Sequence, residues 1–131
     1  MNQDKKKVIA AAIKPILSWY GLKGTLSTDR HSVTLTLKSG KMDLMKTVNE
    51  AYKLSRYYRD GDPEFVESQV NPYHLSDTFK GEQLKAMREL VDALKAAEWF
   101  DKSDIQSDYF NTAYYYHIKI GTWQKPYVVT E

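Results

Sequence analysis

The residue types that most often bind metals or act as nucleophiles are few and scattered in this sequence. The three histidines, His31, His74 and His117, fall in different predicted elements, and no two of them stand at a metal-ligand spacing. There is no cysteine, which excludes disulfides, thiolate nucleophiles and thiolate zinc sites. A scattered histidine is usually a surface group or a satisfied polar contact, so we expect no metal site at these positions.

The acidic residues Asp101, Asp104 and Asp108 have the spacing that comes nearest to a calcium or magnesium site. Carboxylates also favour the first turn of a helix, where the helix dipole is positive, and Ser103 with Gln106 matches a helix-capping pattern. The glycine and the terminal glutamate of a calcium-binding loop are both missing. We therefore predict a helical turn near 104–109, and neither a metal nor a cofactor.

Motifs for nucleophilic or nucleotide-dependent catalysis are not found. The six glycines form neither a G-x-G-x-x-G fingerprint nor a phosphate-binding loop, and no G-x-S-x-G string occurs. No pair of carboxylates stands out for general acid–base catalysis. The sequence favours a protein that is not an enzyme, with catalysis left as an open alternative.

Positive charge is concentrated in the first half of the chain. Residues 1–59 hold 12 Lys/Arg and 4 Asp/Glu, whereas residues 60–131 hold 7 and 13, so a net charge of +2 divides into +8 and −6. The two halves can attract each other in the fold, or the basic half can meet the phosphates of a nucleic acid. For the second alternative the candidate residues are Lys5, Lys6, Lys7, Lys14 and Arg30.

Aromatic residues are concentrated at the other end, because nine of the seventeen fall between Trp99 and Tyr127. Tyrosine and tryptophan serve both as core residues and as frequent hot spots of protein interfaces. We expect Tyr116 and Trp123 to pack in the core, where truncation to alanine costs about 3–5 kcal/mol. The candidates for contact with a protein partner are Tyr109, Tyr115, His117, Lys119, Trp123 and Tyr127.

Hydrophobic periodicity predicts one α+β domain over residues 1–131. A helix over 4–20 is expected to kink or restart at Pro15, and an antiparallel hairpin follows with strands near 22–27 and 33–38. Residues 42–58 fit a short strand and then a helix, or a helix alone, and we favour the strand and helix. An exposed loop is predicted near 60–63, where Asp, Gly and Pro cluster.

The second half begins with a predicted strand within 65–73, whose apolar members are Phe65, Val66 and Val70. An amphipathic helix over about 79–98, capped by Asp77 and Thr78, is expected to pack on the sheet. The last predicted element is an aromatic-rich strand over 112–120. Its alternation predicts a core face of Tyr114, Tyr116, Ile118 and Ile120, and an outer face of Tyr115, His117 and Lys119.

The longest unbroken apolar run, residues 8–13, is much shorter than the roughly 20 residues that cross a bilayer. No small-residue cleavage site follows the basic start of the chain. We therefore expect a cytoplasmic protein without membrane contact.

Several short strings resemble a known family of small phage and prophage proteins. These strings are Lys14–Leu17, Tyr20–Gly24, Ser39–Lys41, Val70–His74, Phe79–Gly81, Ser103–Phe110, Tyr114–Tyr116 and Ile120–Tyr127. The family is similar to a large polyvalent protein-associated domain, the twenty-ninth of that series. The resemblance covers nearly the whole chain, is weakest over 43–69, and supplies no catalytic residue.

The resemblance implies an α+β domain in mobile elements, acting in counter-defence or in early takeover of a host cell. Together with the aromatic segment it predicts a non-enzymatic accessory protein that binds a host or defence protein in the host cytoplasm. The alternative is a nucleic-acid-binding module that uses the basic N-terminal half. The sequence does not predict an oligomeric state.

Overall fold

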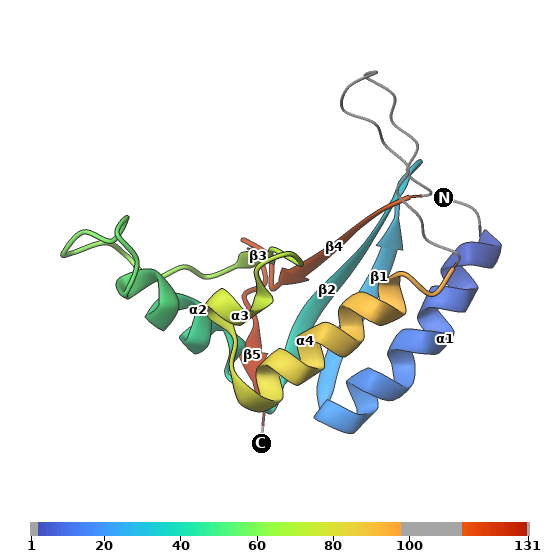
Figure 1. Ribbon diagram of the computed structural model, residues 1–131, viewed down its shortest axis with the longest axis horizontal. Helices are drawn as coiled ribbons and strands as arrows, with labels where there is room; N and C mark the ends of the chain where they lie inside the picture. The colour runs from blue at the N-terminus through green and yellow to red at the C-terminus, as the bar shows by residue number, and fades with distance from the viewer. Residues whose placement is uncertain (1–2, 98–113, 131) are drawn as a thin grey trace.

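A mixed five-stranded sheet with helices on one side forms the body of the protein (Figure 1), as seen in a computed structural model that describes residues 3–97 and 114–130. The class is α+β with an N-terminal helix, as predicted. The elements in chain order are α1 (Gln3–Tyr20), β1 (Leu22–Thr28), β2 (Ser32–Gly40), α2 (Leu44–Lys53), β3 (Ser68–Val70), α3 (Leu75–Thr78), α4 (Gly81–Leu94), β4 (Tyr115–Ile120) and β5 (Val128–Val129).

The strand order is β1-β2-β4-β3, with β5 also paired to β2. The predicted hairpin of β1 and β2 is confirmed and antiparallel, whereas β4 runs parallel to β2, with Val33 opposite Tyr116 and Leu37 opposite Ile120. β5 pairs in parallel with Ser39 and Gly40, the next part of β2. β4 and β5 therefore follow one another along the same side of β2, separated by residues 121–127.

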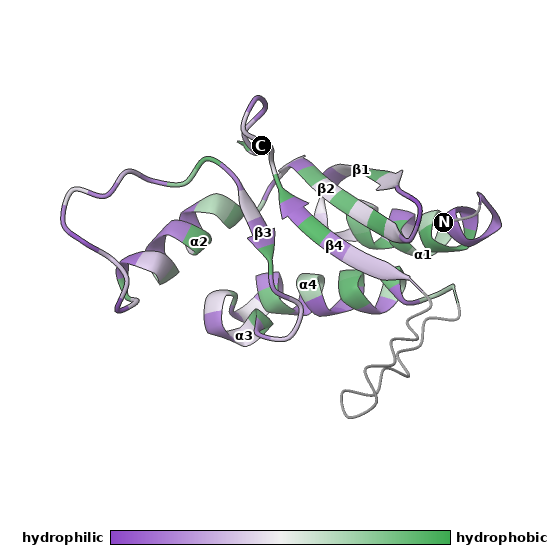
Figure 2. Cartoon of the chain, turned by 90° about the horizontal axis from the view of Figure 1, so that it is seen from above, coloured by the Kyte–Doolittle hydropathy of each residue, from purple (hydrophilic) through white to green (hydrophobic). Residues whose placement is uncertain are grey.

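α1 and α4 lie side by side on one face of the sheet (Figures 1 and 2). The hydroxyl of Tyr20 at the end of α1 donates a hydrogen bond to the carboxylate of Glu89 on α4. Alternation along the strands turns every second side chain towards the helices, as expected for a sheet covered on one side. The buried core includes Ile9 and Ile13 from α1, Val33, Leu35 and Leu37 from β2, Met87, Leu90 and Leu94 from α4, and Tyr116, Ile118 and Ile120 from β4.

α1 is one continuous helix, so the predicted restart at Pro15 is wrong. Both Pro15 and Ala11, whose carbonyl loses its helical partner, are exposed, so water can satisfy that carbonyl. The predicted strand at 42–45 is also wrong, because Asp43 caps α2 there. The Asp43 side chain accepts a hydrogen bond from the backbone N–H of Lys46 at 3.1 Å.

The predicted strand within 65–73 is confirmed only at Ser68–Val70. The amphipathic helix is confirmed with shorter bounds, because Phe79 is extended and buried and α4 starts at Gly81. Asp77 and Thr78 do not cap it, since they form the end of the separate four-residue helix α3. The predicted turn near 104–109, with Asp101, Asp104 and Asp108, lies outside the described residues.

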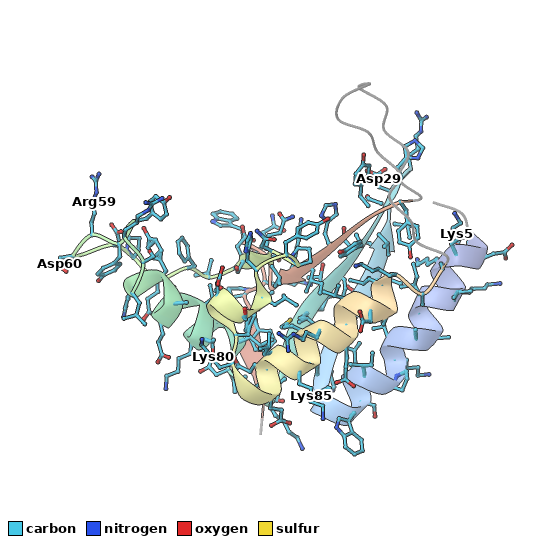
Figure 3. The ribbon with its side chains drawn as sticks, viewed as in Figure 1. Lys5, Asp29, Arg59, Asp60, Lys80 and Lys85 are labelled. Atoms are coloured by element: carbon cyan, nitrogen blue, oxygen red, sulfur yellow. The ribbon has the colours of Figure 1, made fainter. Side chains whose placement is uncertain are left out.

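α2 and the segment 54–67 after it form an arm that projects from the body (Figure 1). Asn49, which is 8% exposed, holds this segment to α2 through its side-chain amide. The amide accepts a hydrogen bond from the backbone N–H of Phe65 at 2.7 Å and donates to the backbone carbonyls of Phe65 and Met45. Figure 3 places Arg59 and Asp60 at the tip of the arm, next to the predicted exposed loop.

Candidate binding surface on the open face of the sheet

None of the described helices covers the face of the sheet that points away from α1 and α4 (Figure 2). Most of the exposed and partly exposed positions of the strands belong to this face and are polar. Its residues alternate with the core residues on the same strands, so the apolar layer on one face fixes the polar layer on the other. We call this surface the open face. It consists of Lys23, Thr25, Ser27, Thr34, Thr36, Lys38, Gln69, Tyr115, His117 and Lys119.

Strand register brings side chains from distant parts of the sequence together on this surface. The Gln69 amide lies 3.4 Å from Nδ1 of His117, 48 residues further along the chain. Hydroxyl groups from β1 and β2 occupy one side of the surface, and nitrogen-bearing side chains from β4 and β3 occupy the other. Thr25, Thr36, Lys119 and Gln69 form one row across the sheet, and Ser27, Thr34 and His117 form the next.

The charge of the open face has one sign. No described strand contains an aspartate or a glutamate, whereas the open face carries Lys23, Lys38 and Lys119 together with His117. Among the described residues, no carboxylate lies within ion-pair distance of any of these three lysines. Within the described strands the formal charge of this surface is therefore positive, which favours anionic ligands.

At the hairpin end of the open face, Tyr115 from the predicted protein-contact residues lies near Arg30 from the predicted nucleic-acid-contact residues. Tyr115 is 52% exposed, and its backbone N–H donates to the carbonyl of His31 at 2.7 Å. Arg30, a candidate for nucleic-acid contact, is the neighbour of His31 in the turn between β1 and β2, where Figure 3 shows Asp29. Tyr115 and Arg30 therefore belong to the same end of the sheet, together with the carboxylate of Asp29, which accepts a hydrogen bond from the Arg30 backbone N–H at 2.7 Å.

The other lysines proposed for nucleic-acid contact belong to α1, on the opposite side of the sheet. Lys5 places its ammonium group 5.9 Å from the centre of the Tyr114 ring, and Figure 3 shows it near the start of the helix. Lys7 and Lys14 are exposed and Lys6 is partly exposed. The lysines of α1 and the lysines of the open face therefore lie on opposite sides of the sheet, and the contact of the α1 lysines with nucleic acid stays a prediction.

At the other end of β4, the structure assigns different roles to the two aromatic candidates beyond the strand. Trp123 is 76% exposed, so the expectation that it packs in the core is wrong, whereas Tyr116 is buried as predicted. Tyr127 is 8% exposed and its hydroxyl donates to the carbonyl of Met42 at 2.7 Å. Burial raises the pKa of Tyr127 to about 12. Tyr127 anchors the loop in the core, and Trp123 is exposed on it.

The other residues predicted to contact a protein partner also differ in their exposure. His117 is partly exposed and Lys119 is exposed on the open face, while Tyr109 lies outside the described residues. Gln69 and the threonines of the hairpin were not among the predicted site residues. The alternation of apolar and polar residues that predicted the hairpin strands could have identified these threonines. When the apolar positions face the core, the polar positions share the opposite face.

A groove of about 540 Å³ lies between the arm and residues 126–127, and the Lys53–Glu64 ion pair of 3.7 Å lies on it. Its charged residues are of both signs. Within residues 3–97 and 114–130, no three His, Asp or Glu side chains are grouped closely enough to hold a metal ion. No described helix has the length and apolar character that crossing a bilayer requires.

Comparison of the chain with protein-family models, with curated proteins and with solved structures gave no match. The geometry and charge of the open face are therefore the basis on which we assign a function to this protein.

Proposed function

We propose that this protein binds nucleic acid through the open face of its sheet. The observation that carries the proposal is a sheet whose described strands hold Lys23, Lys38 and Lys119 and no carboxylate. Lysines that approach phosphates release condensed counterions, which supplies most of the affinity of such surfaces.

The other side chains of the open face suit the same ligand. The hydroxyl groups of Thr34 and Thr36 can donate hydrogen bonds to phosphate or sugar oxygens, which fixes the position of a bound backbone. Tyr115 offers an exposed ring on which a base can stack. Nucleic-acid binding was the alternative drawn from the sequence. The proposal assigns the contact to the sheet and not to the lysines of α1.

The test compares two variants that each lose three positive charges. Lys23→Ala/Lys38→Ala/Lys119→Ala removes the lysines of the open face, and Lys6→Ala/Lys7→Ala/Lys14→Ala is the matched control on α1. Binding of a fluorescein-labelled oligonucleotide is followed by fluorescence anisotropy over a range of salt concentrations.

Three phosphate contacts contribute a slope of about −2 to a plot of log K against log salt for a single strand. We expect the open-face variant to lose that slope and about 100-fold in affinity near 0.1 M salt, because each contact contributes about fivefold there. The α1 variant should keep both. Equal losses in the two variants, or no binding by the wild type, would contradict the proposal.

A second candidate function is binding of a host or defence protein, as the resemblance to phage proteins implies. The observation that favours it is the exposure of large apolar side chains on the arm, where Leu54 is 90%, Tyr57 68% and Val66 46% exposed. Exposed apolar patches are common at protein interfaces. This function predicts a stoichiometric partner that survives nuclease treatment and is lost with Leu54→Ala/Tyr57→Ala.

A further inference from the structure

The loop between β4 and β5 interrupts what is otherwise one line of pairing along β2. The backbone N–H of Gly121 donates to the carbonyl of Leu37 at 2.8 Å, and the N–H of Thr130 donates to that of Gly40, also at 2.8 Å. Between these two bonds the chain leaves the sheet and returns to it. In Figures 1 and 2 the loop lies on the side of the sheet away from α4, which is the side of the open face.

The start of this loop depends on a glycine. Gly121 has φ of +69°, a left-handed conformation in which a Cβ atom would lie 2.6 Å from the backbone nitrogen of Tyr127. The next residue closes the loop, because the backbone N–H of Thr122 donates to the carbonyl of Lys125 at 2.9 Å. In return, the N–H of Lys125 donates to Oγ1 of Thr122 at 3.0 Å.

The end of the loop is held in the core. The Tyr127 hydroxyl bonds to the Met42 carbonyl and lies 2.7 Å from where a Cβ of Gly40 would be, so Gly40 leaves the space that the ring needs. The loop is thus fixed at both ends and closed across its middle. At its tip Trp123 is 76% exposed, with Gln124 and Lys125 after it.

A fixed loop that exposes a tryptophan loses the stabilisation that burying a large aromatic ring would give. Trp123 lies beyond one end of β4 and Tyr115 lies at the other end, with Lys119 on the open face between them. Lys125 adds a positive charge beside Trp123. A positively charged surface with exposed aromatic rings, on which bases can stack, is what proteins use to hold single strands of nucleic acid.

We propose that a single strand of nucleic acid lies along β4, with one base stacked on Tyr115 and another on Trp123. This inference rests on the proposed function and specifies its ligand. Lys119 and Lys125 contact the phosphates between the two bases. A duplex is not the ligand, because its bases are stacked on each other inside the helix and offer no free face to a protein ring.

The experiment uses the intrinsic fluorescence of tryptophan. The wild type, Trp123→Phe and the control Trp19→Phe are titrated with an oligothymidylate of about 12 nucleotides, a length within the usual range of single-strand sites. Trp19 is the matched control because it is 82% exposed and lies on α1. Oligouridylate of the same length distinguishes RNA from DNA, and a duplex of the same length serves as competitor.

We expect binding to quench the fluorescence of the wild type and of Trp19→Phe, and the quenching to disappear in Trp123→Phe. Trp123→Ala should weaken binding about 5-fold or more, since stacking on one ring contributes about 1–3 kcal/mol. Trp19→Ala should bind as the wild type does.

Two results overturn the inference and leave the proposed function standing. One is oligonucleotide binding with quenching unchanged in Trp123→Phe and affinity unchanged in Trp123→Ala. The other is a duplex that competes as well as the single strand does. Binding of no nucleic acid at all would overturn the proposed function itself, and the inference with it.

Discussion

Replacing Gly121 by alanine tests whether the loop between β4 and β5 is fixed as the structure shows. The left-handed conformation at φ of +69° costs an alanine about 1–2 kcal/mol. Its Cβ would also lie 2.6 Å from the backbone nitrogen of Tyr127, so the start or the end of the loop must move. We expect Gly121→Ala to lose about 2–4 kcal/mol in the free energy of unfolding. This is the usual cost of a strained backbone combined with a steric clash.

Gly61 provides the matched control. It has φ of +91°, but nothing lies within 4 Å of the position of its Cβ, so Gly61→Ala meets only the conformational penalty, about 1–2 kcal/mol. Urea unfolding gives both free energies, and a thermal scan should show the melting temperature of Gly121→Ala lower by roughly 8–15 °C. Equal stabilities of the two variants would refute a fixed loop, and with it the argument that Trp123 is presented by a built structure.

Three further predictions concern the core, the arm and alkaline pH. Trp123→Ala should change the free energy of unfolding by less than about 0.5 kcal/mol because its ring is exposed, whereas Tyr116→Ala should lose about 3–5 kcal/mol in urea unfolding. Asn49→Ala should cost about 2 kcal/mol, because it leaves backbone groups of the arm without their partner, and should speed proteolysis of residues 54–67. The hydrogen bond of Tyr20 to a carboxylate and the burial of Tyr127 raise both pKa values from 10.0 to about 12, so the unfolded chain loses these protons first. The melting temperature should therefore be unaffected by these groups below pH 10 and fall as the pH rises from 10 to 12, with a smaller fall in the two Tyr→Phe variants.

The local elements of the fold were readable because their signals are local. The alternation of Val33, Leu35 and Leu37 with threonines predicted the hairpin and the face that it buries. The parallel pairing of β2 with β4 joins residues more than 80 positions apart, and no pattern within either strand specifies its partner. The open face could be assembled only after that pairing was known.

Two incorrect predictions have local physical causes. Trp123 was assigned to the core from its aromatic character, but Gly121 in a left-handed conformation turns the chain out of the sheet before it. Asp43 is followed by an apolar helical pattern, which is a recognised start of a helix, and this cap replaces the predicted strand at 42–45.

Ultraviolet cross-linking of the protein to a single-stranded oligonucleotide, with the attached peptides identified by mass spectrometry, locates the surface that binds the strand. Binding on the open face predicts adducts on the β4 peptide that contains Tyr115 and on the loop peptide that contains Trp123. Adducts confined to the lysine-rich peptides of α1, or their complete absence under conditions where a known single-strand-binding protein cross-links, would contradict it.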